Sequence, residues 1–372
     1  MRRCDAVIVG GGPAGSSCAW ALRRAGRDVV VVDRAAFPRD KICAGWITPA
    51  VVASLEIDVA DFRRGRTFQP ITGFRTGRIR GGHVETRYPE PISFGIRRCE
   101  FDHYLLCRSG AEIRPDTPVA SLRREGERWI VNDDDAIEAP VLVGAGGHFC
   151  PVARHLGGGG GAEPIVAAQE FEVPLDEADA CAVRPEVPEL YFARDFKGYG
   201  WCFRKQGVVN VGYGRFGGER LAPHVADFMD FMRERGRLEA SVSGKMKGHA
   251  YLLYESTPRP PVGDGVLLVG DAAGLAYAPS GEGIRTAVES GLLAAQTILE
   301  AKGSRQADLE PYARRIAARF GGKRKKGGPA RLLPERVVQA LGAGLLASSW
   351  LTRKVVLERW FLHSHQPALT AP

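Results

Sequence analysis

The sequence has no run of apolar residues long enough for a membrane-spanning helix, which needs about 20 of them. Its apolar segment LGAGLLASSWL, residues 341–351, is well short of that length. We therefore expect the chain at most to lie peripherally on the inner face of a membrane. The eight cysteines form no C-x-x-C pair and follow no regular spacing. This pattern predicts neither a zinc site nor a disulfide framework, so we expect no metal, reduced thiols and a cytoplasmic location.

Internal repeats and recognised nucleic-acid-binding modules are also missing, and we predict no nucleic-acid partner. The formal net charge of +8 favours anionic partners such as phosphate-bearing cofactors. The basic residues are spread along the chain, however, so charge alone selects no partner. With 372 residues, 44% of them hydrophobic, the chain can form one large core or two joined cores.

The N-terminal segment CDAVIVGGGPAGSSCAWALRRAGRDVVVVDR has the pattern of a strand, a glycine turn, a helix and a second strand. We expect the strands over residues 6–9 and 29–33 and the helix over residues 13–24. This order is a βαβ unit, whose parallel strands need a crossover helix.

Gly10, Gly12 and Gly15 complete a G-x-G-x-x-G motif between the first strand and the helix. The first glycine allows a tight turn, the second lets the backbone approach a pyrophosphate, and the third permits close packing of helix on strand. The helix N-terminus adds amide donors and positive potential. Asp33, at the end of the second strand, can accept the hydroxyl groups of an adenosine ribose. Together these features predict a dinucleotide site; an ordinary tight turn is the alternative.

Further along the chain, residues 266–269 have the pattern of a buried strand and residues 281–301 that of a helix with a small-residue face. Between the two halves lie short segments of β character, among them GYGWCFRK and VVNVGYGR, joined by Gln206 and Gly207 as a hairpin turn. We predict a mostly antiparallel sheet inserted into the dinucleotide-binding domain. The expected domains are 1–70, 97–160 and 251–301 for the cofactor, 71–96 and 161–250 for the substrate, and 302–372 for a C-terminal helical region.

The segment GVLLVGDAAGLAYAPSGEGIRTAVESG, residues 265–291, resembles the second flavin fingerprint of the p-hydroxybenzoate hydroxylase superfamily. By this resemblance the aspartate of a Gly-Asp pair, here Gly270 and Asp271, binds the ribityl chain. Backbone at Pro279, Gly281 and Gly283 would approach the isoalloxazine ring, where the next helix N-terminus can stabilise negative charge. Taken without the resemblance, an aspartate after a strand is a turn or helix cap. Two fingerprints in this order make FAD the expected cofactor.

Three further segments are similar to geranylgeranyl reductase-like flavoproteins. FPRDKICAGWITPAV is similar to their segment after the second strand, RRCEFDHYLL matches R-x-x-F-D, and GYGWCFRK with VVNVGYG resembles Y-x-W-x-F-P-K followed by N-V-G-x-G. The resemblance implies an α/β fold: a Rossmann-like, glutathione-reductase-like FAD-binding domain with an inserted, mostly antiparallel β-sheet substrate domain and a C-terminal helical segment. It also implies an enzyme that reduces carbon-carbon double bonds of an isoprenoid or similar lipid.

The resemblance and the motifs together assign the site residues. Arg98 would contact the FAD, and Cys43 would lie close to flavin and substrate as the candidate for tuning or protonation there; the alternative for Cys43 is a small buried apolar residue. His148 and His83 are weaker acid candidates. The predicted cofactor-binding residues are Gly10, Gly12, Pro13, Ala14, Gly15, Asp33, Arg34, Arg98, Gly144, Gly270, Asp271, Pro279, Gly281, Gly283 and Ile284, and the predicted substrate-binding residues are Trp46, Tyr199, Trp201, Phe203 and Tyr213.

Tyr199, Trp201 and Phe203 occupy alternate positions, so a β-strand projects all three rings from one face. Such a row commonly fills a core. The flanking Gly198 and Gly200, however, would let backbone or a planar ligand approach closely. With the resemblance included we favour a cavity wall, which suits a long apolar substrate. Tyr213 could donate a proton, and the alternative is that it packs in the sheet.

The sequence also departs from the superfamily pattern. Gly146 replaces an aspartate implicated in FAD and NADPH binding, Cys150 replaces a serine, and Arg204 replaces the proline of the aromatic motif. No second G-x-G-x-x-G with strand and acidic partner follows, so no dedicated NAD domain is expected. Electrons would then come from a transient donor, either NAD(P)H or a reduced ferredoxin or flavodoxin.

Two alternative functions stay open. The first is a flavin monooxygenase of the same fold that hydroxylates an aromatic or polyketide-like compound; Gly146 and the aromatic row count against it. The second is a flavin electron carrier without substrate chemistry, which predicts no deep apolar cavity. The basic run KRKK, residues 323–326, suggests contact with anionic lipid, or else a solvated loop.

Overall fold

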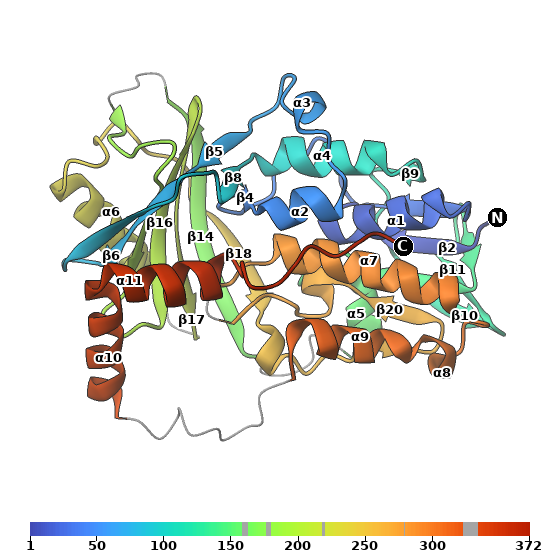
Figure 1. Cartoon of the computed structure of the whole chain (residues 1–372). Coiled ribbons are helices and arrows are strands. Elements are labelled where there is room, and N and C mark those ends of the chain that lie inside the picture. Colours follow the sequence, from blue (N-terminus) through green and yellow to red (C-terminus); the bar gives the residue numbers. More distant parts are fainter. Residues whose placement is uncertain (158–162, 176–179, 218–219, 279, 323–333) are drawn as a thin grey trace.

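The structure is a computed structural model that describes residues 1–157, 163–175, 180–217, 220–278, 280–322 and 334–372. Figure 1 shows two lobes side by side. One contains the N-terminal strands and helices, in blue, together with orange helices from residues near 300; the other is built on a large sheet from the middle of the chain, in green. Among the described helices, none combines the length and apolar character that crossing a bilayer requires.

The first lobe is organised around a six-stranded sheet in which all pairs but one are parallel. The central strand sequences AVIV, VVVV and VLVG are buried at every position, as is typical of a parallel sheet covered on both faces. The predicted βαβ unit is confirmed, with its second strand ending at Val32. In spatial order the strands are β19 (Val262–Gly263), β20 (Val266–Leu268), β13 (Val141–Gly144), β2 (Ala6–Val9), β3 (Val29–Val32) and β9 (Glu112–Arg114).

Helix α1 (Pro13–Arg24) packs closely against α7 (Ile284–Glu300). A Cβ atom on Gly291 of α7 would overlap the carbonyl oxygen of Ala14 and lie 3.1 Å from the backbone nitrogen of Cys18. The missing side chain therefore lets the two helices touch. The helix predicted from residue 281 begins at Ile284 instead, because Gly281 has a φ of 68°, outside the helical region.

The remaining elements of this lobe surround the parallel sheet. A second sheet, of four strands, contains β10 (Leu122–Glu125), β11 (Arg128–Val131), β12 (Ile137–Ala139) and β1 (Arg2–Arg3). The other helices are α2 (Pro49–Ser54), α3 (Val59–Phe62), α4 (Arg98–Arg108), α5 (Pro151–His155), α8 (Gln306–Leu309) and α9 (Pro311–Phe320), with 3-10 turns η2 (Tyr254–Ser256) and η3 (Gly270–Ala272).

The second lobe contains a seven-stranded sheet whose only parallel pair is β15 with β6. The predicted mostly antiparallel sheet is thus confirmed. Residues 206 and 207 form the predicted hairpin turn, and Gln206 adopts a φ of 51°. In spatial order the strands are β18 (Lys247–Leu252), β14 (Ile165–Pro174), β17 (Val208–Phe216), β16 (Gly198–Lys205), β15 (Glu189–Phe192), β6 (Gly73–Arg78) and β7 (His83–Arg87).

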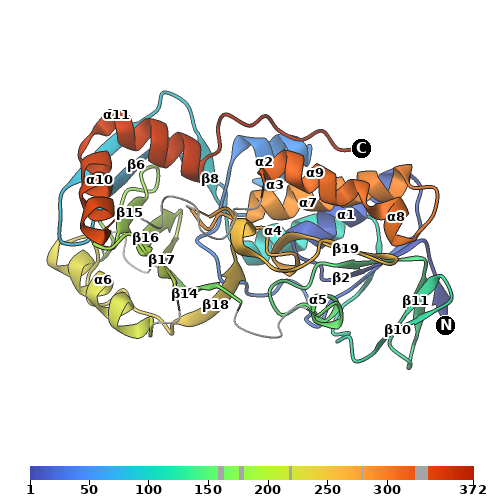
Figure 2. The same cartoon turned by 90° about the horizontal axis from the view of Figure 1, so that it is seen from below.

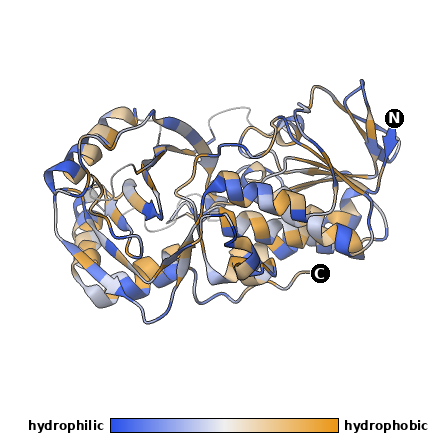
Figure 3. Cartoon of the chain, turned by 90° about the horizontal axis from the view of Figure 1, so that it is seen from above, coloured by the Kyte–Doolittle hydropathy of each residue, from blue (hydrophilic) through white to orange (hydrophobic). Residues whose placement is uncertain are grey.

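Helices flank this sheet, and a small fourth sheet joins it to the first lobe. Helix α6 (Ala222–Glu234) packs its apolar residues on one face of the sheet. In Figure 3 orange and blue alternate along the surface helices, the pattern of amphipathic helices. The small sheet contains β4 (Trp46–Ile47), β8 (Ser93–Gly95) and β5 (Gln69–Ile71), and the C-terminal helices are α10 (Glu335–Ala347), α11 (Ser349–Leu351) and the π-helix η5 (Thr352–Phe361). We propose that the two large sheets are the cores of separate cofactor and substrate domains.

The C-terminal segment returns from the second lobe to the first (Figures 1 and 2). Arg285, buried near the start of α7, donates hydrogen bonds to the carbonyl oxygens of Leu362, His363, Gln366 and Pro367. Arg319 of α9 also donates to the carbonyl oxygen of Pro367, at 2.7 Å. The backbone of residues 362–367 is therefore fixed to the first lobe by two guanidinium groups.

We expect Gly291→Ala to lower the free energy of unfolding by about 1–3 kcal/mol, because the added methyl group overpacks the α1–α7 contact. Gly344→Ala is the control: Gly344 is an exposed residue of α10, and its Cβ would meet open space. That change should leave stability unchanged or raise it by up to about 1 kcal/mol through helix propensity. Urea unfolding of both variants measures the difference, and equal effects would show that the helices tolerate a methyl group.

Candidate active site

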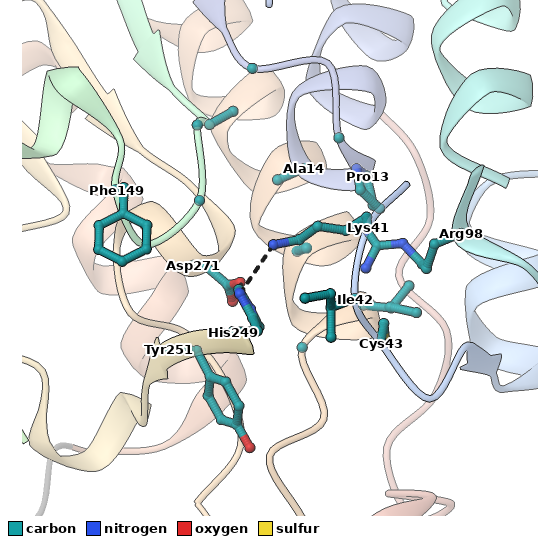
Figure 4. Close-up of a pocket in the computed structure, with 18 of the residues that line it drawn as sticks. Pro13, Ala14, Lys41, Ile42, Cys43, Arg98, Phe149, His249, Tyr251 and Asp271 are labelled. Carbon is teal, nitrogen blue, oxygen red and sulfur yellow. Dashed lines mark hydrogen bonds and ion pairs between the residues drawn. The ribbon is translucent and has the colours of Figure 1, made fainter. Parts of the chain in front are cut away.

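A cavity of about 590 Å³ is lined by residues from both lobes. Its walls come from the glycine turn after β2, the segment between β3 and β4, the large sheet, and the turn that precedes α7. Figure 4 shows side chains from these segments directed toward one another. Of the predicted site residues, those that line the cavity are Gly10, Gly12, Pro13, Ala14, Asp33, Arg34, Cys43, Trp46, Arg98, Tyr199, Trp201, Phe203, Asp271, Gly281, Gly283 and Ile284.

The glycine turn has the geometry that a pyrophosphate requires. Gly10 has a φ of 117°, and a Cβ there would overlap the carbonyl oxygen of Ala145. A Cβ on Gly15 would overlap the carbonyl oxygen of Gly10, so this glycine serves the packing of helix on strand and does not line the cavity. Gly12 is the N-cap of α1 and has no capping side chain. The helix start thus presents backbone to the cavity, which suits a bound anion.

Asp33 lies at the cavity wall directly after β3. Its carboxylate accepts hydrogen bonds from the backbone nitrogens of Gly11 at 2.8 Å and Ala35 at 3.0 Å. These bonds fix the side chain beside the glycine turn. Gly144, at the end of β13, does not line the cavity: a Cβ there would meet Leu268 and Val152, so its role is packing.

The second fingerprint meets the cavity through Asp271, which lies in η3. Its carboxylate is 3.5 Å from Nε2 of His249, whose Nδ1 is 3.3 Å from Nζ of Lys41 (Figure 4). Burial opposes ionisation, but His249, Lys41 and Arg98 outweigh it and lower the pKa of Asp271. The site therefore holds an anionic carboxylate beside basic groups.

Some of the other residues of this fingerprint line the cavity, and others serve packing. Gly281, with a left-handed φ, lies where a Cβ would overlap the Tyr251 hydroxyl, so only glycine fits. Gly270 packs against Ala14 and Ala287 and does not line the cavity. Pro279, also predicted to bind the cofactor, lies outside the described residues.

Arg98, the first residue of α4, reaches the cavity beside Cys43. It donates two hydrogen bonds to the fully buried Asp102, at 2.7 and 2.8 Å. Such a bidentate pair fixes the guanidinium plane. Burial raises the pKa of the Cys43 thiol, and the nearby Arg98 opposes that rise.

The aromatic row of β16 forms both a core and a cavity wall. Tyr199, Trp201 and Phe203 line the cavity and also pack in a cluster with residues of η5. The Tyr199 hydroxyl donates to the carbonyl oxygen of Ser280 at 2.5 Å, which joins the wall to the turn before α7. Trp46 packs edge-on against Phe203, with ring centroids 5.4 Å apart. The two interpretations of this row are therefore not exclusive.

The prediction that Tyr213 binds substrate needs correction. Tyr213 does not line the cavity; it is buried against α6, near His224 and Phe228. The reason is register: Tyr213 pairs with Gly200, and directly paired residues share a face of the sheet. Gly200 also points to α6, where a Cβ would meet Phe228.

Some of the residues that depart from the superfamily pattern line the cavity, and others do not. Gly146 lines the cavity, and a Cβ there would be 3.3 Å from Sγ of the buried Cys150. Arg204 does not line the cavity and donates to the carbonyl oxygen of Cys181 at 3.1 Å. His148 does not line it either, and His83 is exposed on β7.

Several cavity residues were missed in the sequence. His249, Tyr251 and Phe361 follow no motif that would have identified them, whereas Lys41 and Glu282 lie within the segments FPRDKICAGWITPAV and residues 265–291 and were not assigned a role there. Glu170 had a signal: it is a charged residue within VAAQEFEV, a strand with strong apolar character. It is 4% exposed, and burial raises its pKa to about 7.

The fold and the cavity define the class of the protein. A glycine turn at a helix start, a fixed carboxylate after the next strand, a second aspartate after β20 and an inserted antiparallel sheet are the features of an FAD-dependent oxidoreductase. The residues present suit FAD, because only glycine fits at position 10 and the start of α1 opens onto the cavity.

Comparison with known proteins gives the same class. A family model described as FAD dependent oxidoreductase matches residues 5–87. The chain is 30% identical over 324 residues to the menaquinone reductase of Mycolicibacterium smegmatis, covering 79% of this chain and 76% of that protein. It is also 30% identical to the chloroplastic geranylgeranyl diphosphate reductase of Oryza sativa subsp. japonica, covering 86% of this chain and 72% of that protein.

A solved structure shares the fold of the whole chain. The crystal structure of a geranylgeranyl bacteriochlorophyll reductase-like protein from Thermoplasma acidophilum has a TM-score of 0.78 and 19% identity, with 98% of both chains covered. The chain therefore belongs to the geranylgeranyl reductase family of FAD-dependent oxidoreductases, and FAD is its cofactor.

The raised pKa of Glu170 predicts a pH-dependent effect of Glu170→Gln on stability. The folded protein keeps this proton up to about pH 7, whereas an ordinary glutamate releases it near 4.5. Stability of the unmodified protein therefore falls as pH rises between these values. The stability of Glu170→Gln relative to the parent should rise by up to about 3 kcal/mol across that window. Denaturant unfolding at several pH values measures it, and a constant difference would contradict it.

Proposed function

We propose that this enzyme reduces carbon-carbon double bonds in an isoprenoid chain. The observation that carries the proposal is the aromatic wall of β16, which faces the same cavity as the two cofactor fingerprints. The names of the relatives refer to isoprenoid compounds, namely menaquinone and geranylgeranyl diphosphate. A long apolar chain gains about 0.8 kcal/mol for each methylene buried against such a wall.

In this proposal one end of the cavity binds the cofactor and the other end binds the substrate. The backbone around Gly12 holds the cofactor pyrophosphate, Asp33 holds the adenosine ribose, and Asp271 holds the ribityl chain. Bound and reduced, FAD supplies a hydride. Gly281 and Gly283 line the cavity and would bring backbone toward the flavin ring, while the aromatic residues would position the alkene and exclude water.

Cys43 lies where it can influence both parts of the site. It lines the cavity, and Arg98 lies beside it. The thiol stays protonated at neutral pH because burial raises its pKa. We propose that Cys43 tunes the reactivity of the flavin where flavin and substrate meet.

The electron donor is proposed to bind transiently. The sequence has no second dinucleotide motif, and Gly146 stands where the superfamily has an aspartate. NAD(P)H or a reduced ferredoxin or flavodoxin would then deliver electrons without a dedicated domain. The alternative of an electron carrier without substrate is disfavoured by the aromatic-walled cavity of about 590 Å³.

An anaerobic experiment tests the reaction. The purified holoenzyme is reduced with dithionite and mixed separately with geranylgeranyl diphosphate, menaquinone and 4-hydroxybenzoate. We expect an isoprenoid to reoxidise the flavin without oxygen, giving a product in which one double bond of the chain is saturated. Reduction of the menaquinone ring to the quinol adds the same two hydrogens, so the product is reoxidised in air before its mass is measured. Flavin oxidation only in air, with oxygen incorporated into 4-hydroxybenzoate, would establish the monooxygenase instead. Donor oxidation without any organic product would establish the carrier.

We also propose that the C-terminal helices contact the membrane that holds the substrate. Val337 and Leu341, one turn apart on α10, are 40% and 62% exposed, and Trp350 of α11 is 65% exposed. Exposed apolar and tryptophan side chains favour the membrane interface. Phe361, at the end of the following π-helix, lines the cavity, so the same segment connects this surface with the site. The basic run 323–326 lies outside the described residues.

Sedimentation with anionic phospholipid vesicles tests this contact. The double variant Leu341→Glu, Trp350→Glu should bind vesicles at least several-fold more weakly than the parent, because two apolar contacts become charged. Phe216→Glu is the matched control, since Phe216 is an exposed aromatic residue at the end of β17, 43% exposed. Equal vesicle binding by the double variant and the parent would contradict the proposal.

A further inference from the structure

A buried carboxyl group lies under the aromatic wall without an assigned role. Glu170, on β14, lines the cavity and is 4% exposed. Its Oε1 accepts a hydrogen bond from the backbone nitrogen of Cys43. Its Oε2 is buried and has no hydrogen-bond partner within the described residues. A buried polar atom left unpaired costs stability, so such an atom in a cavity indicates a group that acts on something bound there.

The surroundings hold this carboxyl against the substrate wall. Glu170 pairs with Gly212 of β17, and a Cβ on Gly212 would overlap both the Trp201 indole and the Glu170 side chain. The glycine thus lets the indole and the carboxyl lie next to each other. The indole nitrogen of Trp201 donates to Oδ1 of Asn210 at 2.8 Å, and Nδ2 of Asn210 is 3.3 Å from the carbonyl oxygen of Cys43. Trp201, Asn210 and the Cys43 backbone therefore form a frame around Glu170.

From these contacts we propose that Glu170 is the proton donor of the reduction, delivering its proton from Oε2 to one carbon of the alkene. This inference rests on the proposed function. The reaction adds a hydride, which the reduced dihydroflavin supplies, to one alkene carbon. The π electron pair forms the second C–H bond with the proton of Glu170. The glutamate is left as a carboxylate and regains a proton from water before the next turnover.

The electrostatic setting supports this role. Burial raises the pKa of Glu170 to about 7, so the acid form is populated at neutral pH and its conjugate base readily recovers a proton. The charged groups around it are Lys205 of β16, which pairs with Glu172 at 2.6 Å, and Lys247 of β18, which pairs with Asp40 at 2.7 Å. Cys43 and Arg98 face it from the cavity. Burial, together with Glu172, raises the pKa of Glu170 and outweighs Lys205, which lowers it.

Glu282 is the competing carboxyl group. It also lines the cavity, its Oε2 lacks a partner among the described residues, and burial raises its pKa to about 7. It lies between Gly281 and Gly283, in the turn that approaches the cofactor, whereas Glu170 lies beneath Trp201. The position under the substrate wall favours Glu170.

Single-turnover formation of the product with one saturated chain double bond, from geranylgeranyl diphosphate or menaquinone and the reduced enzyme without oxygen, tests the assignment over pH 5.5–9. The parent rate should fall about tenfold per pH unit above about pH 7, because the acid form disappears. Glu170→Gln should be about 10²-fold slower or more and lose this pH dependence. Glu239→Gln, at an exposed position outside the cavity lining, should keep the decline above pH 7.

A second readout does not depend on turnover. Infrared titration of the protein without cofactor should show carboxyl C=O absorption that disappears near pH 7, one part of which is lost in Glu170→Gln and the other part in Glu282→Gln. The proposal is overturned if Glu170→Gln keeps the parent rate and pH profile, or if Glu282→Gln or Cys43→Ser alone removes the decline. A parent enzyme that oxidises with neither isoprenoid would instead refute the proposed function, and the assignment with it.

Discussion

The site depends on one buried ammonium group, Nζ of Lys205. This side chain is 1% exposed and donates to the carbonyl oxygens of Ala44 and Ile96, at 2.9 and 3.0 Å, and to Glu172 at 2.6 Å. A charge removed from water must be paired, so these partners cannot separate without a large cost. The contacts join the end of β16, the Cys43 segment and the small sheet. Gly45 and Gly95 make room for the lysine, since a Cβ on either would meet it.

Each of the two large sheets that meet near this junction forms one half of the cavity. The parallel sheet ends at the glycine turn and at Asp33, which provide backbone amides and a fixed carboxylate. The antiparallel sheet offers alternating faces, one to α6 and one to the cavity. The Cys43 segment lies between them, with Arg98 on one side and Glu170 on the other. A charged cofactor and an apolar chain can thus meet in one space although they need opposite surroundings.

The sequence predicted the parts of this arrangement that depend on local patterns. The run of buried valines, the three glycines and the alternating aromatics each identify an element and a face, and the structure has them at those positions. What it could not predict is which face meets which partner. Tyr213 was misassigned because its face depends on pairing with Gly200 across a hairpin, and not on its own neighbours in sequence. Glu170 and Lys205 gain their properties from burial by segments more than a hundred residues away, which no local pattern encodes.

The buried Arg285 gives the C-terminal segment a mechanical role. Together with Arg319, which donates to Pro367, it binds the backbone of residues 362–367 and makes a second connection between the lobes, separate from the chain crossings near the cavity. Because η5 precedes this anchor and carries Phe361 into the aromatic wall, the anchor holds the end of this wall against the first lobe. Arg285 follows Ile284, which lines the cavity at the start of α7. The aromatic wall and the start of α7 are thereby both tied to residues 361–367.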